Sequence, residues 1–213
     1  MLLRLAEAGS LADLATFVAR AKRVDPDGAT RLQCVGAVLA VYVSPVHGAG
    51  SPTVLGLRTF ALAEPSVLDV VVPLATLTDR FARTTPRDVS TLSVPPAQAT
   101  GVAWAGVSPP RSGWAELGTV DGLVLANAAR DGVAEVAAGA GEASGAPAVA
   151  RLRAGVWGRS LPGTPDLPAG VAYAADALGF LTGGEPVEVR SSGPWWRAST
   201  SRGHVLARQP VVL

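Results

Sequence analysis

The C-terminal part of the chain is organised around residues 185–200, which read EPVEVRSSGPWWRAST. Its two ends are rich in valine, tryptophan, arginine and threonine, and the Ser-Ser-Gly-Pro stretch between them contains turn-forming residues. This arrangement predicts a β-hairpin. A further stretch, His204–Arg208, predicts a third strand.

Three helices are expected before this hairpin, in a C-terminal domain of residues 114–213. They begin near Thr119, near residue 147 and at Pro168, and the GAGEASGAP segment at 139–147 predicts a flexible linker between the first two. In the first helix, Leu125, Ala129, Val133 and Val136 would share the packed side. The order of three helices followed by a hairpin is that of a winged-helix module.

An N-terminal domain of residues 1–83 is predicted to have the order α-β-β-β-α with an antiparallel sheet, because its connections are short. Apolar residues recur at helical spacing from Ser10 to Ala21, and Pro73 can open a second helix. Strands are predicted at Val35–Val43, Thr53–Ala61 and Leu68–Val72, the last two separated by a turn at Glu64-Pro65. The first of these is apolar on both faces, which favours a central strand.

Residues 84–113 are rich in proline, serine and threonine, and they predict an extended connector with a short strand at Gly101–Val107 around Trp104. The fold class expected from the whole chain is therefore α+β. Hydrophobic residues make up 48% and charged residues 16% of the 213 residues, a balance that excludes disorder for most of the chain.

The composition also bears on origin and compartment. Lys22 is the single lysine among 18 basic residues, and together with the abundant alanine, glycine and proline this favours GC-rich coding and a bacterial source. No apolar stretch reaches the roughly 20 residues of a membrane span. The N-terminus lacks the apolar core of a signal peptide, and Cys34 has no second cysteine to pair with. We therefore expect a cytoplasmic protein with no membrane association.

Several classes of enzyme lack their residues in this sequence. There is no phosphate-binding loop with its lysine, no G-x-S-x-G nucleophile elbow, and no paired spacing of Cys34, His47 and His204 for a metal. We expect no catalytic residues, no metal and no cofactor, so a non-enzymatic protein is favoured. A hydrolase that uses His47, which lies in a loop, is the enzymatic alternative.

The positive indication of function lies in the C-terminal third. Residues 151–213 contain seven arginines and four acidic residues, a net charge of +3, whereas residues 1–150 have 11 basic and 13 acidic residues. Alternation along the hairpin would place Trp195 beside Arg197 on an exposed face and Trp196 beside Ala198 on a packed one. The predicted recognition surface consists of Trp195, Arg197, Arg190, Arg202 and His204, since tryptophan and arginine are enriched at interface hot spots.

A protein partner or self-association as a homodimer is the favoured use of this surface. DNA binding by the winged-helix order is the alternative, although the candidate recognition helix at 168–181 has no Arg, Lys, Asn or Gln to read bases. The stretch Gly179–Val189 followed by Trp195-Trp196-Arg197 loosely resembles bacterial SH3-like repeats. Their usual closing Gly-Trp-Val is replaced here by Gly203-His204-Val205, and we do not assign the chain to that family.

Overall fold

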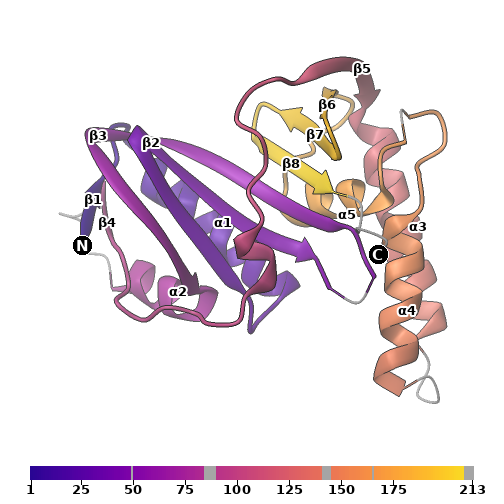
Figure 1. Ribbon diagram of the computed structural model, residues 1–213, viewed down its shortest axis with the longest axis horizontal. Coiled ribbons are helices and arrows are strands. Elements are labelled where there is room, and N and C mark those ends of the chain that lie inside the picture. Colours follow the sequence, from indigo (N-terminus) through magenta and orange to yellow (C-terminus); the bar gives the residue numbers. More distant parts are fainter. Residues whose placement is uncertain (49, 84–89, 141–144, 165, 209–213) are drawn as a thin grey trace. The chain divides into compact units, whose positions relative to one another are not determined.

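The computed structural model describes residues 1–48, 50–83, 90–140, 145–164 and 166–208. It divides into two compact units (Figure 1), one of Met1–Ser44 with Leu57–Gly106 and the other of Pro45–Gly56 with Val107–Leu213. The described residues form five α-helices, a six-stranded antiparallel sheet in the order β2-β3-β8-β7-β6-β5, and a two-stranded sheet of β1 and β4. The α+β class expected from the sequence is confirmed.

The two α-helices of the first unit are those that the sequence predicts. Helix α1 (Ser10–Val24) buries one apolar stripe, and helix α2 (Leu74–Ala82) follows Pro73 and buries Leu74 and Leu77. The two helices contact each other. The buried stripe of α1 consists of Leu11, Leu14, Phe17, Val18 and Ala21, together with Ser10.

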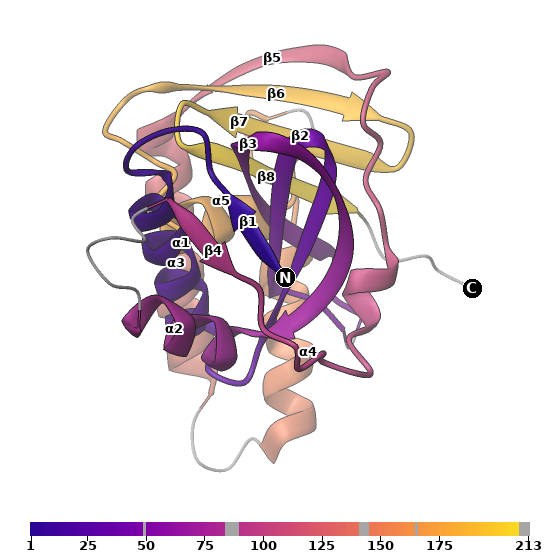
Figure 2. The same cartoon turned by 90° about the vertical axis from the view of Figure 1, so that its left-hand side faces the viewer.

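Two long strands replace the three that were predicted in this half of the chain. Strand β2 spans Ala29–Val46, and strand β3 runs without interruption from Thr53 to Pro73 and curves along its length (Figure 2). The predicted turn at Glu64-Pro65 is wrong. A proline can remain in a strand where its missing N–H faces no neighbouring strand, and Pro65 is exposed.

Strand β2 contains a bulge at Gly36, whose φ of 58° lies in the left-handed region. The buried residues before it are Thr30, Leu32 and Cys34, and those after it are Leu39, Val41 and Val43. The alternation of burial therefore shifts by one residue across the bulge. Val35 and Val38 are 49% and 45% exposed, so the prediction of a central strand covered on both faces is wrong. The homodimer was expected partly because such a strand would need packing on both faces, and it stays a prediction.

Short elements before α1 and after α2 complete the first unit. Strand β1 (Leu2–Arg4) pairs with β4 (Thr91–Ser93) in an antiparallel manner, and Leu5 forms an isolated bridge with Leu62 of β3. The strand predicted at Gly101–Val107 is wrong, because Ala103–Gly106 forms the 3-10 helix η1, which buries Trp104. Strands β1 and β4 have three residues each, which is too short for an alternating pattern to predict them from the sequence.

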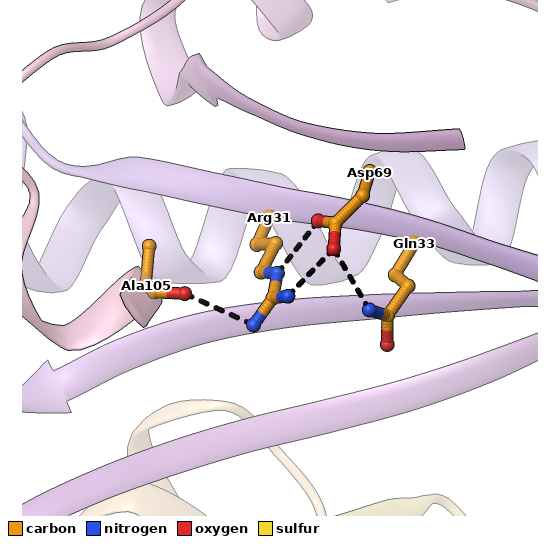
Figure 3. A network of polar contacts seen from close by, with 4 residues as sticks. All are labelled: Arg31, Gln33, Asp69 and Ala105. Carbon is orange, nitrogen blue, oxygen red and sulfur yellow. Dashed lines mark hydrogen bonds and ion pairs between the residues drawn. The ribbon is translucent and has the colours of Figure 1, made fainter. Parts of the chain in front are cut away.

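A polar network fastens η1 to the two long strands (Figure 3). The Arg31 guanidinium donates from Nε and Nη2 to the Asp69 carboxylate at 2.7 and 2.6 Å, and from Nη1 to the Ala105 carbonyl oxygen at 2.9 Å. Gln33 donates to the same carboxylate at 2.9 Å. The hydrogen bond to Asp69 raises the pKa of Arg31, although burial opposes it. The network therefore joins β2, β3 and η1 with a charge-assisted pair.

The second unit contains a strand that the sequence did not predict. Strand β5 (Ala115–Asp121) pairs antiparallel with β6, and helix α3 (Gly122–Gly139) starts only after it, with Asp121 accepting from the Leu123 N–H as N-cap. The predicted start near Thr119 is therefore early. The buried side of α3 consists of Gly122, Leu125, Ala129 and Gly132, while Val133 is exposed.

Two more helices pack with α3 in this unit. Helix α4 (Gly145–Gly158) and helix α5 (Ala169–Ala177) occur where helices were predicted, and residues 141–144 of the predicted linker lie outside the described residues. Trp157 is buried, and its ring stacks on Tyr173 with centroids 4.4 Å apart. Helix α5 buries six of its nine residues. It therefore does not present the exposed face that a groove-reading helix requires.

The hairpin and third strand at the C-terminal end are confirmed. Strands β6 (Pro186–Ser192), β7 (Trp195–Thr200) and β8 (Gly203–Arg208) are connected in sequence and pair as antiparallel neighbours. Helix α5 contacts β8. None of the helices described is long and apolar enough to cross a membrane.

Candidate functional site

Strand register decides which of the predicted site residues lie together. Arg190 of β6 is directly opposite Arg197 of β7, and Ser199 of β7 is directly opposite His204 of β8. Because directly paired residues and residues two apart share one face of a sheet, Arg190, Arg197 and His204 all lie on the same face. We call this the outer face. The opposite, inner face carries Val189, Ala198 and Val205, each at most 2% exposed.

The expectation for the two tryptophans is wrong. By register Trp195 lies on the outer face, as expected, but it is buried with only 4% of its surface exposed. Trp196 lies on the inner face beside the turn and is half-buried. The position opposite Trp195 is Arg208, whose aliphatic stem is long enough to cover an indole ring. Trp195 is thus a packing residue and not the exposed centre of a recognition surface.

The open part of the outer face is built around Arg197. Its guanidinium lies 4.7 Å from the centroid of the Trp114 ring, close enough for a cation–π contact. Trp114 is held by a hydrogen bond from its indole N–H to the Pro110 carbonyl oxygen at 3.2 Å. Arg190, on the other strand, forms an ion pair with Glu188 at 3.0 Å. We call Trp114, Glu188, Arg190, Arg197 and His204 the arginine patch.

The positive charge of the arginine patch is unevenly balanced, because Glu188 and Glu116 both neighbour Arg190 while Arg190 itself lies directly opposite Arg197. Like charges directly opposite each other on neighbouring strands are destabilising, and Arg190 and Arg197 are such a pair. Burial, and then the neighbouring Arg190, lowers the pKa of Arg197, while Glu188 opposes the shift. The Arg197 Nε is buried and has no hydrogen-bond acceptor among the described residues. Native proteins leave few buried donors in that state.

His204 is kept neutral by the same surroundings. Burial lowers the pKa of His204 below its ordinary value, Arg197 and Arg190 lower it further, and Glu188 raises it. Its Nδ1 lies 2.9 Å from the Ser199 hydroxyl oxygen. At neutral pH the ring therefore supplies a hydrogen-bonding group to the patch and no charge.

Arg202, the remaining predicted site residue, is exposed in the turn between β7 and β8. Its backbone N–H donates to the Thr200 hydroxyl at 3.1 Å. It lies near Glu185, whose carboxyl pKa is lowered by hydrogen bonds from Thr182 and Ser201 and, to a smaller extent, by Arg202 itself. Nothing in the contacts of Arg202 joins it to the arginine patch.

The sequence did not single out Trp114 or Ser199 as part of this site. Trp114 precedes β5, and only the pairing of β5 with β6 brings that end of the chain beside the hairpin. The pairing joins residues more than 60 positions apart, for example Glu116 and Arg190, and no local pattern signals it. Glu188 could have been found from its spacing, because residues two apart in a strand share a face.

Other candidate chemistry is not assembled in the part of the chain that the structure describes. His47 is exposed in the turn between β2 and β3. A pocket of about 300 Å³ in the first unit is lined by other residues, among them Arg80, Arg83 and Thr91. No group of three or more His, Cys, Asp or Glu among the described residues is placed to hold a metal ion.

Comparisons with known proteins match two consecutive parts of the chain. Residues 1–106 match the family model described as a domain of unknown function (DUF8010), and residues 109–212 match a second such domain (DUF8185). The boundary between the two matches falls where the first structural unit ends, at Gly106. No curated protein matches the chain.

Among solved structures, the fold is similar to a crystal structure of the beta sliding clamp of C. crescentus with bound polyethylene glycol. The TM-score is 0.51 and the sequence identity 12%. The similarity covers 100% of this chain and 66% of the clamp chain, so the present chain spans just under two thirds of that protein's length. At this identity the similarity concerns the fold.

Proposed function

We propose that the protein is a non-enzymatic binding protein and that the arginine patch is its recognition surface for a protein partner. The observation that carries the proposal is the direct opposition of Arg190 and Arg197 on neighbouring strands, beside the ring of Trp114. A surface that serves stability alone gains nothing from two facing arginines. Arginine and tryptophan are the residues that most often dominate the energy of protein interfaces.

Three further features support a binding role. Arg190 keeps 31% of its side chain exposed and Glu188 keeps 54%, so groups of both signs remain accessible at one spot. The patch stands on strands whose inner face is fully packed, and rigid elements hold interface residues better than loops do. The clamp-like fold is compatible with a binding role.

The second unit is less suited to binding DNA than to binding a protein partner. Helix α5 is mostly buried, so it offers no exposed face to a DNA groove.

The proposal is tested by affinity capture with the full-length protein as bait. Wild type and an Arg159→Ala variant should retain the same specific partner, because Arg159 pairs with Glu135 outside the patch. An Arg197→Ala variant and, separately, an Arg190→Ala variant should lose that partner while keeping the wild-type thermal midpoint within a few degrees. A set of captured proteins that is identical for all four baits would overturn the proposal.

A further inference from the structure

We infer that the arginine patch binds a carboxylate of an acidic polypeptide segment, with Arg190 and Arg197 holding its oxygens and Trp114 supporting the bound chain. This inference rests on the proposed function and names the chemistry of the partner. The donors that would hold the carboxylate are already placed on two paired strands.

The acids of this face lie beside Arg190 and not beside Arg197. Glu188 pairs with Arg190 at 3.0 Å, and Glu116 of β5 lies directly opposite Arg190. The residues directly opposite Arg197 are Arg190 and Leu206, so no acid faces Arg197 across the strands. Arg197 has the ring of Trp114 on one side, but a ring face compensates a cation less well than an anion does. A carboxylate placed between the two guanidinium groups would turn their repulsion into two attractions.

The hydrogen-bond donors of Arg197 also favour a carboxylate. Its Nε is buried by the chain itself, but its two terminal nitrogens are not among the buried atoms that lack a partner in the described residues. A guanidinium presents its donors in a planar fork that matches the two oxygens of a carboxylate, so one carboxylate could engage both terminal nitrogens together.

Trp114 favours a polypeptide over a small inorganic anion. Its ring already contacts the Arg197 guanidinium, and the aliphatic part of a glutamate or a neighbouring apolar residue can add apolar contact with that ring, which a small anion cannot. Glu188 can pair with a basic side chain of the same peptide, and nucleic-acid backbones have no basic group to offer it. Mixed charge of this kind favours an acidic peptide over a polyphosphate.

The experiment is a titration of the full-length protein with an N-acetylated, C-amidated hexaglutamate peptide at low salt. Binding is followed by tryptophan fluorescence and, independently, by isothermal calorimetry. The matched neutral probe is hexaglutamine, and a duplex DNA of random sequence serves as the polyphosphate probe. We expect saturable binding of hexaglutamate alone, with the affinity decreasing as salt is added.

Variants assign the binding to the patch. Arg197→Ala and Arg190→Ala should each weaken the binding of hexaglutamate by at least about tenfold, because each removes a charge-assisted bond. Arg197→Lys should weaken it as well, since lysine keeps the charge and loses the fork. Arg159→Ala should bind as wild type does. Circular dichroism and thermal midpoints establish that each variant is folded.

Several results would overturn this inference. They are equal binding of hexaglutamine, tighter binding of DNA than of hexaglutamate, or loss of affinity in Arg159→Ala equal to that in Arg197→Ala. Absence of hexaglutamate binding would also overturn it, yet the proposed function would stand if affinity capture still showed a partner that depends on Arg197. The two proposals can therefore fail separately.

Discussion

Replacing Gly132 by alanine should destabilise the protein, although the same change usually stabilises a helix. Gly132 lies inside α3, where it faces the buried ring of Trp157. An added Cβ would come within 2.5 Å of Trp157 Cζ3 and 2.9 Å of Cη2. Carbon atoms prefer separations of about 3.5–4.0 Å, so the ring or the helix must move by roughly 1 Å. The ring cannot move freely, because it stacks on Tyr173.

The magnitude follows from two opposing effects. Alanine is favoured over glycine inside a helix by about 0.5–1 kcal/mol. Overpacking a filled core costs about 1–3 kcal/mol, and a contact this short with a rigid ring belongs to the upper part of that range. We therefore expect Gly132→Ala to lower the free energy of unfolding by about 1–2 kcal/mol.

Gly155 of α4 provides the matched control. It is also a glycine inside a helix, but a Cβ added there would meet no atom within 4 Å. Gly155→Ala should therefore raise the free energy of unfolding by about 0.5–1 kcal/mol. Urea unfolding followed by circular dichroism measures both changes. If Gly132→Ala proved as stable as Gly155→Ala, the close packing of α3 against Trp157 would be refuted.

Two further predictions concern the hairpin. Trp195→Ala should lower the free energy of unfolding by about 3–5 kcal/mol, as a large-to-small change at a buried site. Trp196→Ala should lower it by less, because that ring is half-buried. Chemical denaturation of both variants tests this, and a larger effect of Trp196→Ala would contradict the burial of Trp195. Because the folded protein holds the pKa of His204 below its ordinary value of 6.5, the unfolded chain takes up the proton first as the pH falls. The free energy of unfolding should therefore decrease as the pH falls below about 6.5 and recover above it, and His204→Gln should flatten this dependence. An unchanged pH profile in the variant would show that His204 is not responsible.

Sequence patterns correctly predicted the elements that form from one short stretch of the chain. The stripe of α1 is visible because its apolar residues recur at helical spacing, and the hairpin is visible because a turn sequence separates two strand-forming stretches. Strand β3 was divided wrongly, since Glu64-Pro65 is a turn signal in isolation while tertiary context keeps the strand extended through it. Strand β5 was missed because its partner, β6, lies far along the chain.

The candidate site shows the same limit. Alternation correctly placed Arg197 and Trp195 on one face and Trp196 with Ala198 on the other. Alternation does not show how much of each sheet face is buried, because the elements that pack on a face are distant in the sequence. The pairing of Arg190 with Arg197 follows from the two-residue Gly-Pro connection of the hairpin, but Trp114 reaches Arg197 only through the assembled sheet.

The bulge at Gly36 governs how the length of strand β2 can vary. The strand directs successive side chains to opposite faces, so burial of both Cys34 and Leu39, five positions apart, depends on the one extra residue between them. Removing that extra residue would leave the two four positions apart, and a regular strand would then keep both sets on their own faces without a bulge. Away from the bulge, removing a single residue would exchange the buried and solvent-facing sets along one half of the strand. Removing or adding two there would keep each set on its own face. Outside the bulge the length of this strand is therefore constrained by parity: an even change conserves its two surfaces, and an odd change exchanges them.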